Sequence, residues 1–471
     1  REHARGEMRG GSRRAALLLG WVSTVGGLVK PSGSAYRPLV LPLTAADGTP
    51  GVYCDPTTPL AARVFASCPS LSAGFYYDPP TLWGSNGGAQ TILAALKRKT
   101  CAVVYTRELL ATPDGGTLAL DMLTSVSSTH ASTLSAMGEG STVVPIEETK
   151  ARELANTRPF LLLTSGLGGG SQDSYVRSMA AAASTAGWHV AVLNMRGCGG
   201  SQITSPRFFS AHRGSTDDVR VAVAHCRVSA HLARDAPCVA AVGWSNGATI
   251  INNALAEQST THPGSTHWLD AGATLACPLN MIAANKNLQR PFHRLAYDRS
   301  IANGLVRNFV QSGARDVFAK AQRDGSTFEG WDGTQMTVDI EKLLLCRTIE
   351  AIDAELTAPC FGFASVAEYY ADASSDQRLS SVRVPLLAVN AFDDPLAPGH
   401  SLPFAAFRRS ESVMLALTAH GGHLGWCDEE APFGEPRWVE ETVCDFFAAA
   451  LLPAGLKPDR AQQLESATES L

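Results

Sequence analysis

The sequence lacks the cysteine patterns that accompany structural metal sites and disulfide frameworks. Its eleven cysteines are an odd number, they are scattered from Cys54 to Cys444, and no two of them have the Cys-x-x-Cys spacing. Zinc sites and small disulfide-stabilised domains depend on closely spaced Cys and His groups. We therefore expect reduced, mostly buried thiols and no bound metal.

Long basic runs are also absent beyond the N-terminal segment. The 471 residues include 39 Lys and Arg against 44 Asp and Glu, which gives a net charge of −5. Nucleic-acid binding needs concentrated positive charge, so we predict no nucleic-acid partner. The content of 45% apolar and 18% charged residues is that of a folded protein and excludes a disordered or polytopic membrane chain.

No apolar run reaches the ~20 residues that span a bilayer. The best candidate is residues 15–29, which follow three arginines and are interrupted by Ser23 and Thr24. Three interpretations stay open for this segment: a signal sequence, a membrane anchor or the first buried helix. The location of the protein accordingly stays open between membrane-associated and cytoplasmic.

The apolar pattern changes along the chain. Residues 36–158 are rich in Pro, Gly and Thr and carry short alternating runs around a Pro-Asp-Gly-Gly turn at 113–116, which predicts antiparallel strands and hairpins. From about residue 159, continuous apolar segments alternate with helical patterns, which predicts a doubly wound, mostly parallel α/β sheet. The apolar segments are 160–164, 189–193 and 239–242, and the helical ones are 175–186 and the stretch that begins at Ser215.

The alternation stops near Pro278. The following segment has helical spacing, for example Leu345, Ile349, Ile352 and Leu356 at i, i+4, i+7 and i+11. Strand patterns return at 384–390 and 413–417, followed by a helical one at about 438–451. We therefore expect a basic and apolar segment at 1–35, a core formed by 36–275 and 381–455, a helical insertion at 276–380 and a polar tail at 456–471.

The strongest local signal is Gly-Trp-Ser-Asn-Gly at 243–247, between an apolar strand and a helical segment. A strand-to-helix turn of this kind holds its serine in a strained backbone conformation, and the small residues two positions before and after it prevent clashes. The pattern predicts that Ser245 is a nucleophile. The alternative is a Gly-rich turn with an exposed serine.

A serine hydroxyl needs a base, and the base needs an orienting group. In this type of sheet the expected chain order is Ser, acid, His. Asp393 and Asp394 follow the strand at 386–390, and His423 follows the strand at 413–417 within His-Gly-Gly-His. Each alone would be interpreted as a solvated loop residue, but the three in this order predict a catalytic triad.

A triad also requires two fixed donors for the oxyanion. One is the backbone N–H of Asn246, and we assign the other to Leu167 in the loop Ser-Gly-Leu-Gly-Gly-Gly at 165–170. A phosphate-binding loop is the rival interpretation. It fails both templates, because Ser171 replaces the last glycine and no Gly-Lys-Ser/Thr follows, so we expect no nucleotide or other cofactor.

Two weaker signals each have a purely structural interpretation as well as a functional one. His212 and Asp217 have a spacing found in some acyltransferases, but Asp217 and Asp218 also suit the positive end of the helix that follows. Arg196 could bind an anionic head group, although a salt bridge within its loop is the interpretation we favour.

Together these motifs resemble the α/β-hydrolase fold superfamily, in the branch of α/β-hydrolase domain-containing proteins 1, 2 and 3 and their bacterial and plant putative-esterase relatives. The resemblance covers about residues 81–446 and includes Leu-Trp-Gly-Ser-Asn-Gly at 82–87, Asn-Met-Arg-Gly-Cys-Gly-Gly-Ser at 194–201 and Asp-Asp-Pro at 393–395. One departure is Ser165-Gly166, where many hydrolases have His-Gly. Because the oxyanion donor is a backbone N–H, we expect this departure to affect geometry rather than activity.

The resemblance implies an acyl-enzyme mechanism with Asp394 as the acid, and a carboxylic ester substrate, either a small molecule or a lipid acyl ester. It also implies contact with a membrane surface. By chain topology, the insertion at 276–380 should form a lid over Ser245. Its aromatic residues either line an acyl pocket or pack within the insertion: Phe361, Phe363, Tyr369 and Tyr370. An acyltransferase using Ser245 and a catalytically inactive binding protein remain the alternative functions.

Overall fold

The computed structural model describes residues 46–72, 77–100, 102–127, 158–229, 238–260, 268–323, 327–429, 432–434 and 437–451. These residues belong to one compact unit, Pro38–Leu471. The segment at 15–29 and the tail at 456–471 lie outside the described residues. Within the described ranges, no helix is both long enough and apolar enough to cross a membrane.

A nine-stranded sheet in the order β1-β11-β10-β7-β6-β4-β5-β3-β2 carries the fold. The six strands from β11 to β5 are parallel, whereas β1, β2 and β3 each pair antiparallel to a neighbour. The predicted mostly parallel sheet with antiparallel N-terminal strands is thereby confirmed. The strands are β1 Gly51–Tyr53, β2 Ala102–Ala111, β3 Thr117–Ser127, β4 Phe160–Thr164, β5 His189–Asn194, β6 Val239–Trp244, β7 Ala271–Leu275, β10 Leu386–Ala391 and β11 Val413–Thr418.

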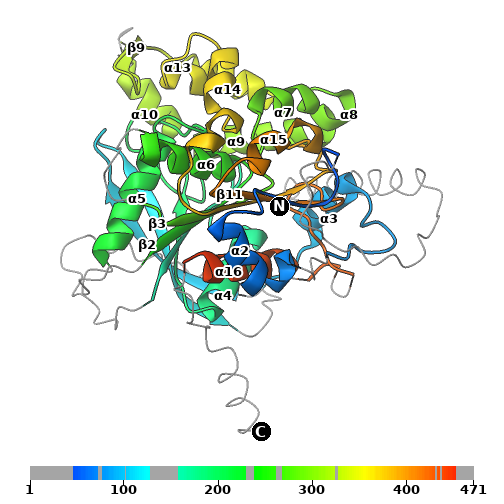
Figure 1. The fold of residues 1–471 in the computed structure, drawn as a ribbon. Coiled ribbons are helices and arrows are strands. Elements are labelled where there is room, and N and C mark those ends of the chain that lie inside the picture. The colour runs from blue at the N-terminus through cyan, green and yellow to red at the C-terminus, as the bar shows by residue number, and fades with distance from the viewer. Residues whose placement is uncertain are drawn as a thin grey trace, which may run out of the picture. The chain divides into compact units, whose positions relative to one another are not determined.

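Helices cover both faces of the sheet (Figure 1). Alternate residues of the fully apolar strand β4 enter different cores: Leu161 and Leu163 belong to one buried cluster and Leu162 to the other. This alternation is the period-two geometry of a strand buried on both sides. Helices α2 Pro59–Ser67, α4 Ser174–Thr185 and α16 Arg437–Leu451 pack on one face, and α5 Ser215–Ser229 and α6 Asn246–Thr260 on the other.

The antiparallel strands and the hairpin predicted for the N-terminal region are present, but the region also contains helices that were not predicted. It contains α2 and α3 (Gly87–Lys97) as well as the β2–β3 hairpin. Both helices begin at a side-chain cap: the Thr58 hydroxyl accepts the Ala61 N–H, and the Asn86 amide oxygen accepts the Ala89 N–H. Such caps satisfy N–H groups that a helix start leaves free. A short 3₁₀-helix, Pro69–Leu71, follows α2.

The segment between β7 and β10 is mainly helical and lies on the same side of the sheet as α6 (Figure 1). Its predicted helical stretch over 345–356 is interrupted, because α11 ends at Leu345 and the Thr348 hydroxyl caps a new helix by accepting the Ala351 N–H. The elements are α7 Met281–Leu288, α8 Pro291–His293, the π-helix η2 Arg294–Asp298, α9 Arg299–Gln311, α10 Ala314–Ala321, β8 Phe328–Glu329, β9 Gln335–Met336, α11 Ile340–Leu345, α12 Ile349–Ile352, the π-helix η4 Asp353–Thr357, α13 Ala358–Cys360, α14 Val366–Ala373 and the 3₁₀-helix η5 Asp376–Ser381. After β10 come the 3₁₀-helix η6 Gly399–Ser401 and α15 Phe404–Arg408.

Candidate active site

The site forms where parallel strands end. Ser245 follows β6, Asp394 follows the end of β10, and His423 lies in the loop after β11. Leu167 lies in the loop after β4, beside β6 in the sheet. Because parallel strands end at one edge of the sheet, these four loops meet there. The sheet order therefore gathers residues that are up to 256 positions apart.

The turn at Ser245 has the strained geometry of a nucleophile elbow. Ser245 has a φ of +52°, a region that non-glycine residues rarely adopt. A Cβ at Gly247 would lie 2.4 Å from the carbonyl oxygens of both Thr164 and Ser165, and one at Gly243 would lie 2.4 Å from the Gly247 carbonyl oxygen. Both positions consequently require glycine, which explains the sequence pattern on either side of the serine.

A continuous chain of hydrogen bonds links the three residues predicted as a triad. His423 Nε2 lies 2.8 Å from Ser245 Oγ, and His423 Nδ1 lies 2.8 Å from Asp394 Oδ2. The Asp394 carboxylate is buried and also accepts the backbone N–H groups of Leu396 and Ala397, at 2.7 and 2.8 Å. This arrangement suits transfer of the serine proton to the imidazole, with a fixed carboxylate stabilising the imidazolium.

The neighbouring Asp393 points elsewhere. Its carboxylate accepts the Gly422 N–H at 2.9 Å and lies 3.1 Å from His420 Nδ1. Asp393 thus braces the loop that carries His423, whereas Asp394 is the acid that contacts the His423 ring.

Helix α3 supports the same histidine loop, which the sequence did not indicate. Thr91 Oγ1 accepts the His423 backbone N–H at 2.8 Å. A Cβ at Gly422 would lie 2.1 Å from the Gly87 carbonyl oxygen, so the loop approaches the helix more closely than a side chain allows. The related sequence signal was the motif at 82–87, whose Asn86 caps α3 in the structure.

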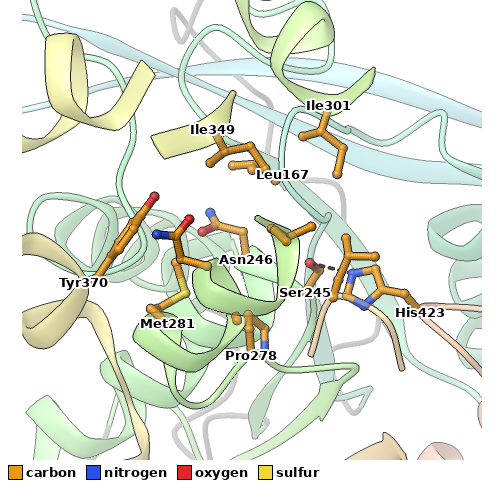
Figure 2. A pocket seen from close by; sticks show the side chains of 13 residues that line it. Leu167, Ser245, Asn246, Pro278, Met281, Ile301, Ile349, Tyr370 and His423 are labelled. Carbon is orange, nitrogen blue, oxygen red and sulfur yellow. Dashed lines mark hydrogen bonds between the residues drawn. The ribbon is translucent and has the colours of Figure 1, made fainter. Parts of the chain in front are cut away.

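The two residues predicted to supply the oxyanion donors both lie in the pocket beside the serine. Leu167 and Asn246 line the same pocket as Ser245 and His423 (Figure 2). Among the described residues, neither backbone N–H donates to a protein acceptor. Both N–H groups are therefore available to a ligand oxygen.

A tyrosine holds the loop that carries Leu167. The Tyr175 hydroxyl accepts the Gly166 N–H at 3.0 Å and donates to the Asp173 carboxylate at 2.7 Å. The same carboxylate oxygen accepts the Gly170 N–H at 3.1 Å, so both ends of the loop are fixed. Burial and the adjacent Asp173 raise the pKa of Tyr175 well above its usual value, so the hydroxyl stays a donor. No pattern in the sequence indicates the pair formed by Tyr175 and Asp173.

The pocket beside Ser245 encloses about 550 Å³ of empty space, including its mouth. Figure 2 shows Ser245 and His423 on one side and Tyr370 and Met281 on the other. Between them the walls are mostly aliphatic, from Pro278, Ala284, Leu288, Ile301, Ile349 and Leu396, with Asn285 as a polar exception.

Tyr370 connects the pocket to a buried acid. Its hydroxyl donates to Asp353 at 2.9 Å, and burial raises the pKa of Asp353 to about 6. The other three aromatic candidates do not line this pocket. Phe361 lies in the large core, Tyr369 accepts the Ala211 N–H, and Phe363 packs against Tyr369.

The residues of the two weaker sequence signals, at His212 and Arg196, form structural contacts. His212 lies between the carboxylates of Asp372 and Glu257, at 2.6 and 2.7 Å, and makes no contact with Asp217. Asp217 instead accepts hydrogen bonds from Arg220 and from the Trp331 indole.

Arg196 forms a structural salt bridge, as we favoured, but its two partners lie outside its own loop. Its guanidinium donates to Asp114 and Asp218 and is 3% exposed, which leaves it no free edge for a head group. In the described part of the chain, no group of three or more His, Cys, Asp or Glu side chains is arranged to hold a metal ion.

Comparison with known proteins adds an independent finding. Residues 159–429 match the family model described as "alpha/beta hydrolase fold". Embryogenesis-associated protein EMB8 of Picea glauca is 32% identical over 77% of this chain and 70% of its own length. Phospholipase ABHD3 of Mus musculus is 28% identical over 77% and 75%, and monoacylglycerol lipase of Saccharomyces cerevisiae is 29% identical over 64% and 63%. The chain belongs to the α/β-hydrolase fold family, in the branch of the α/β-hydrolase domain-containing proteins.

Proposed function

We propose that this chain is a serine hydrolase that cleaves carboxylic esters, in particular lipid acyl esters. The observation that carries the proposal is the chain of hydrogen bonds from Asp394 through His423 to Ser245, with the serine at a strained elbow. Family membership supports it, as do the names of the phospholipase and lipase relatives.

The mechanism follows from the positions of the atoms. Ser245 Oγ attacks the carbonyl carbon of the ester and gives its proton to His423 Nε2, while the Leu167 and Asn246 N–H groups bind the oxyanion. Collapse of the tetrahedral intermediate breaks the bond to the alcohol, which leaves with the proton from His423. Water then repeats the sequence on the acyl-enzyme, and the acid product and free serine are released.

The pocket supports an acyl substrate. Its aliphatic walls offer an apolar site directly beside Ser245, and α7, α12 and α14 each contribute to it through Met281, Ile349 and Tyr370. Residues 276–380 therefore act as a lid over a core formed by 36–275 and 381–455. In this arrangement the lid side chains select the acyl group, whereas the loops at the sheet edge carry out the reaction.

A fluorophosphonate probe tests the proposal. It should label the wild-type chain, and Ser245→Ala should abolish both labelling and ester hydrolysis. Ser300→Ala is a matched control, because this serine is exposed on α9 and should leave labelling intact. Labelling that survives Ser245→Ala would remove the elbow from the mechanism.

A panel of short-chain esters, monoacylglycerols and phospholipids would then define the substrate. Adding a competing alcohol to a labelled acyl ester would separate hydrolysis from transfer, since an acyltransferase would pass the label to the alcohol. A chain that binds the ester without turnover would instead be an inactive binding protein.

A further inference from the structure

Helix α7 faces the pocket on one side and solvent on the other. Met281, Ala284 and Leu288 line the pocket at helical spacing. The opposite face carries Ile282 and Lys286, four positions apart, and both are exposed. A ligand on the outer face would therefore lie about one helix diameter, ~10 Å, from the pocket.

Four cations line the outside of this part of the insertion: Lys286, Arg290, Arg294 and Arg299. All four are exposed, and among the described residues none of them forms an ion pair. The chain as a whole has a net charge of −5, so this local excess of positive charge differs from the overall balance.

The nearby carboxylates are already engaged. Asp298 is buried and accepts the Ile349 N–H at 2.7 Å. Glu350 accepts hydrogen bonds from the side-chain amides of Asn285 and Gln289. Arg294 acts on Asp298 electrostatically without forming an ion pair, so none of the four cations has a close carboxylate partner among the described residues.

Three large apolar side chains lie exposed among the cations. Ile282 and Phe292 are each 52% exposed, and Leu295 is 69% exposed. We call these three residues and the four cations the α7–α9 surface. Phe292 and Leu295 are three positions apart on the continuous helical segment α8–η2 and so share one side of it. Exposed apolar side chains that share a surface mark interaction sites.

The α7–α9 surface is fixed to the candidate active site. The Asn287 side chain donates to the Pro395 carbonyl at 2.6 Å, one residue after Asp394. His293 Nδ1 lies 3.0 Å from the Asn287 carbonyl oxygen, which ties the turn before η2 to the same point. The surface is therefore held in one position relative to the triad.

We propose that the α7–α9 surface docks onto a lipid bilayer that contains anionic lipids. Cations attract such a leaflet, and exposed Phe and Leu side chains enter its interfacial region. A nucleic acid or a free phosphate would satisfy the cations but leave Phe292 and Leu295 in water. Docking here would bring the pocket close to the leaflet that holds lipid esters. The proposal adds an interaction site to the proposed function, and its test does not depend on turnover.

Vesicle binding by the full chain tests the proposal. Vesicles of ether-linked phosphatidylcholine, with or without ether-linked phosphatidylglycerol, contain no acyl ester to cleave. We expect flotation with the anionic vesicles, weakened by salt. Each Lys or Arg near an anionic leaflet strengthens binding about fivefold, so replacing all four cations by Gln should weaken it by up to about 600-fold. The double variant Phe292→Ser, Leu295→Ser should also lose affinity.

Two surface changes elsewhere serve as controls. Arg63→Gln removes an exposed cation from α2, on the other face of the sheet, and Val104→Ser removes an exposed apolar side chain from β2. Both should bind vesicles like the wild type. All variants should hydrolyse a soluble ester at the wild-type rate, which separates failure of docking from failure of the proposed function.

Hydrogen–deuterium exchange locates the contact. Anionic vesicles should protect the backbone of residues 282–299. The proposal would be overturned if the four-cation variant still bound anionic vesicles with wild-type affinity. It would also be overturned if the vesicles protected only other segments from exchange. Absence of any vesicle binding would overturn it as well. A dimer that dissociates in the variants would also overturn it, because the surface would then be a protein contact.

Discussion

Removing one hydroxyl group tests whether the loop at 165–170 forms an oxyanion hole. In Tyr175→Phe, the buried Gly166 N–H loses its acceptor, and Asp173 loses a hydrogen bond donor. Leu167 is the next residue after Gly166. If the backbone at Gly166 rotates once its hydrogen bond is lost, the direction of the Leu167 N–H changes. We expect slower turnover although the ring stays in place.

The magnitude follows from these contacts. A buried polar group left without its partner costs about 1–3 kcal/mol, so the free energy of unfolding should fall by about that amount. Complete loss of one oxyanion donor lowers kcat by about 10²–10³-fold. A displaced donor retains part of its effect, so Tyr175→Phe should lower kcat by roughly tenfold to a hundredfold. KM should change little, because Tyr175 does not line the pocket.

Steady-state kinetics on a soluble ester and urea unfolding measure the two effects separately. Tyr53→Phe is a matched control: its hydroxyl donates to the Thr49 carbonyl at 2.7 Å, and Tyr53 lies on the edge strand β1. It should lose stability without losing kcat. If Tyr175→Phe likewise lowered the free energy of unfolding without lowering kcat, the positioning role of Tyr175 would be refuted. A rise in KM at constant kcat would refute it as well.

Four further substitutions probe other parts of the site and fold. Asp394→Asn should lower kcat on the order of 10⁴-fold, because the His423 ring loses its orienting charge, whereas Asp393→Asn should have a much smaller effect in the same assay. Ile301→Trp narrows the pocket and should shift the preference toward shorter acyl chains in a panel of p-nitrophenyl esters. Burial raises the pKa of Glu440 from 4.5 to about 8, so the native state holds an extra proton between these values and loses stability as pH rises through them. Glu440→Gln removes this penalty, and urea unfolding should show its advantage growing by on the order of 1 kcal/mol per pH unit until about pH 8.

The parts of the fold that depend on local rules could be predicted from the sequence. The elbow is one, because a strained serine needs glycine two positions before and after it, and the chain has Gly243 and Gly247 there. Strand β7 was harder to recognise: its sequence Ala-Gly-Ala-Thr-Leu has no large β-branched residues, and it is a strand because it lies between β6 and β10. No sequence pattern predicts the hydrogen bond from the Gly166 N–H to the Tyr175 hydroxyl, because it depends on how a loop folds back onto a helix.

The α7–α9 surface shows how a short irregularity can hide a pattern. Its cations are spaced by four, four and five positions, and five residues of an α-helix would place Arg294 and Arg299 ~140° apart around the axis. In η2, however, the Arg299 N–H donates to the Arg294 carbonyl, five residues earlier, which is the wider turn of a π-helix. This wider turn brings the two side chains back toward one face. A search for regular helical spacing passes over such a group. The extra residue that aligns Arg294 with Arg299 breaks the periodicity, and the chain leaves the helix at Arg290, between α7 and α8.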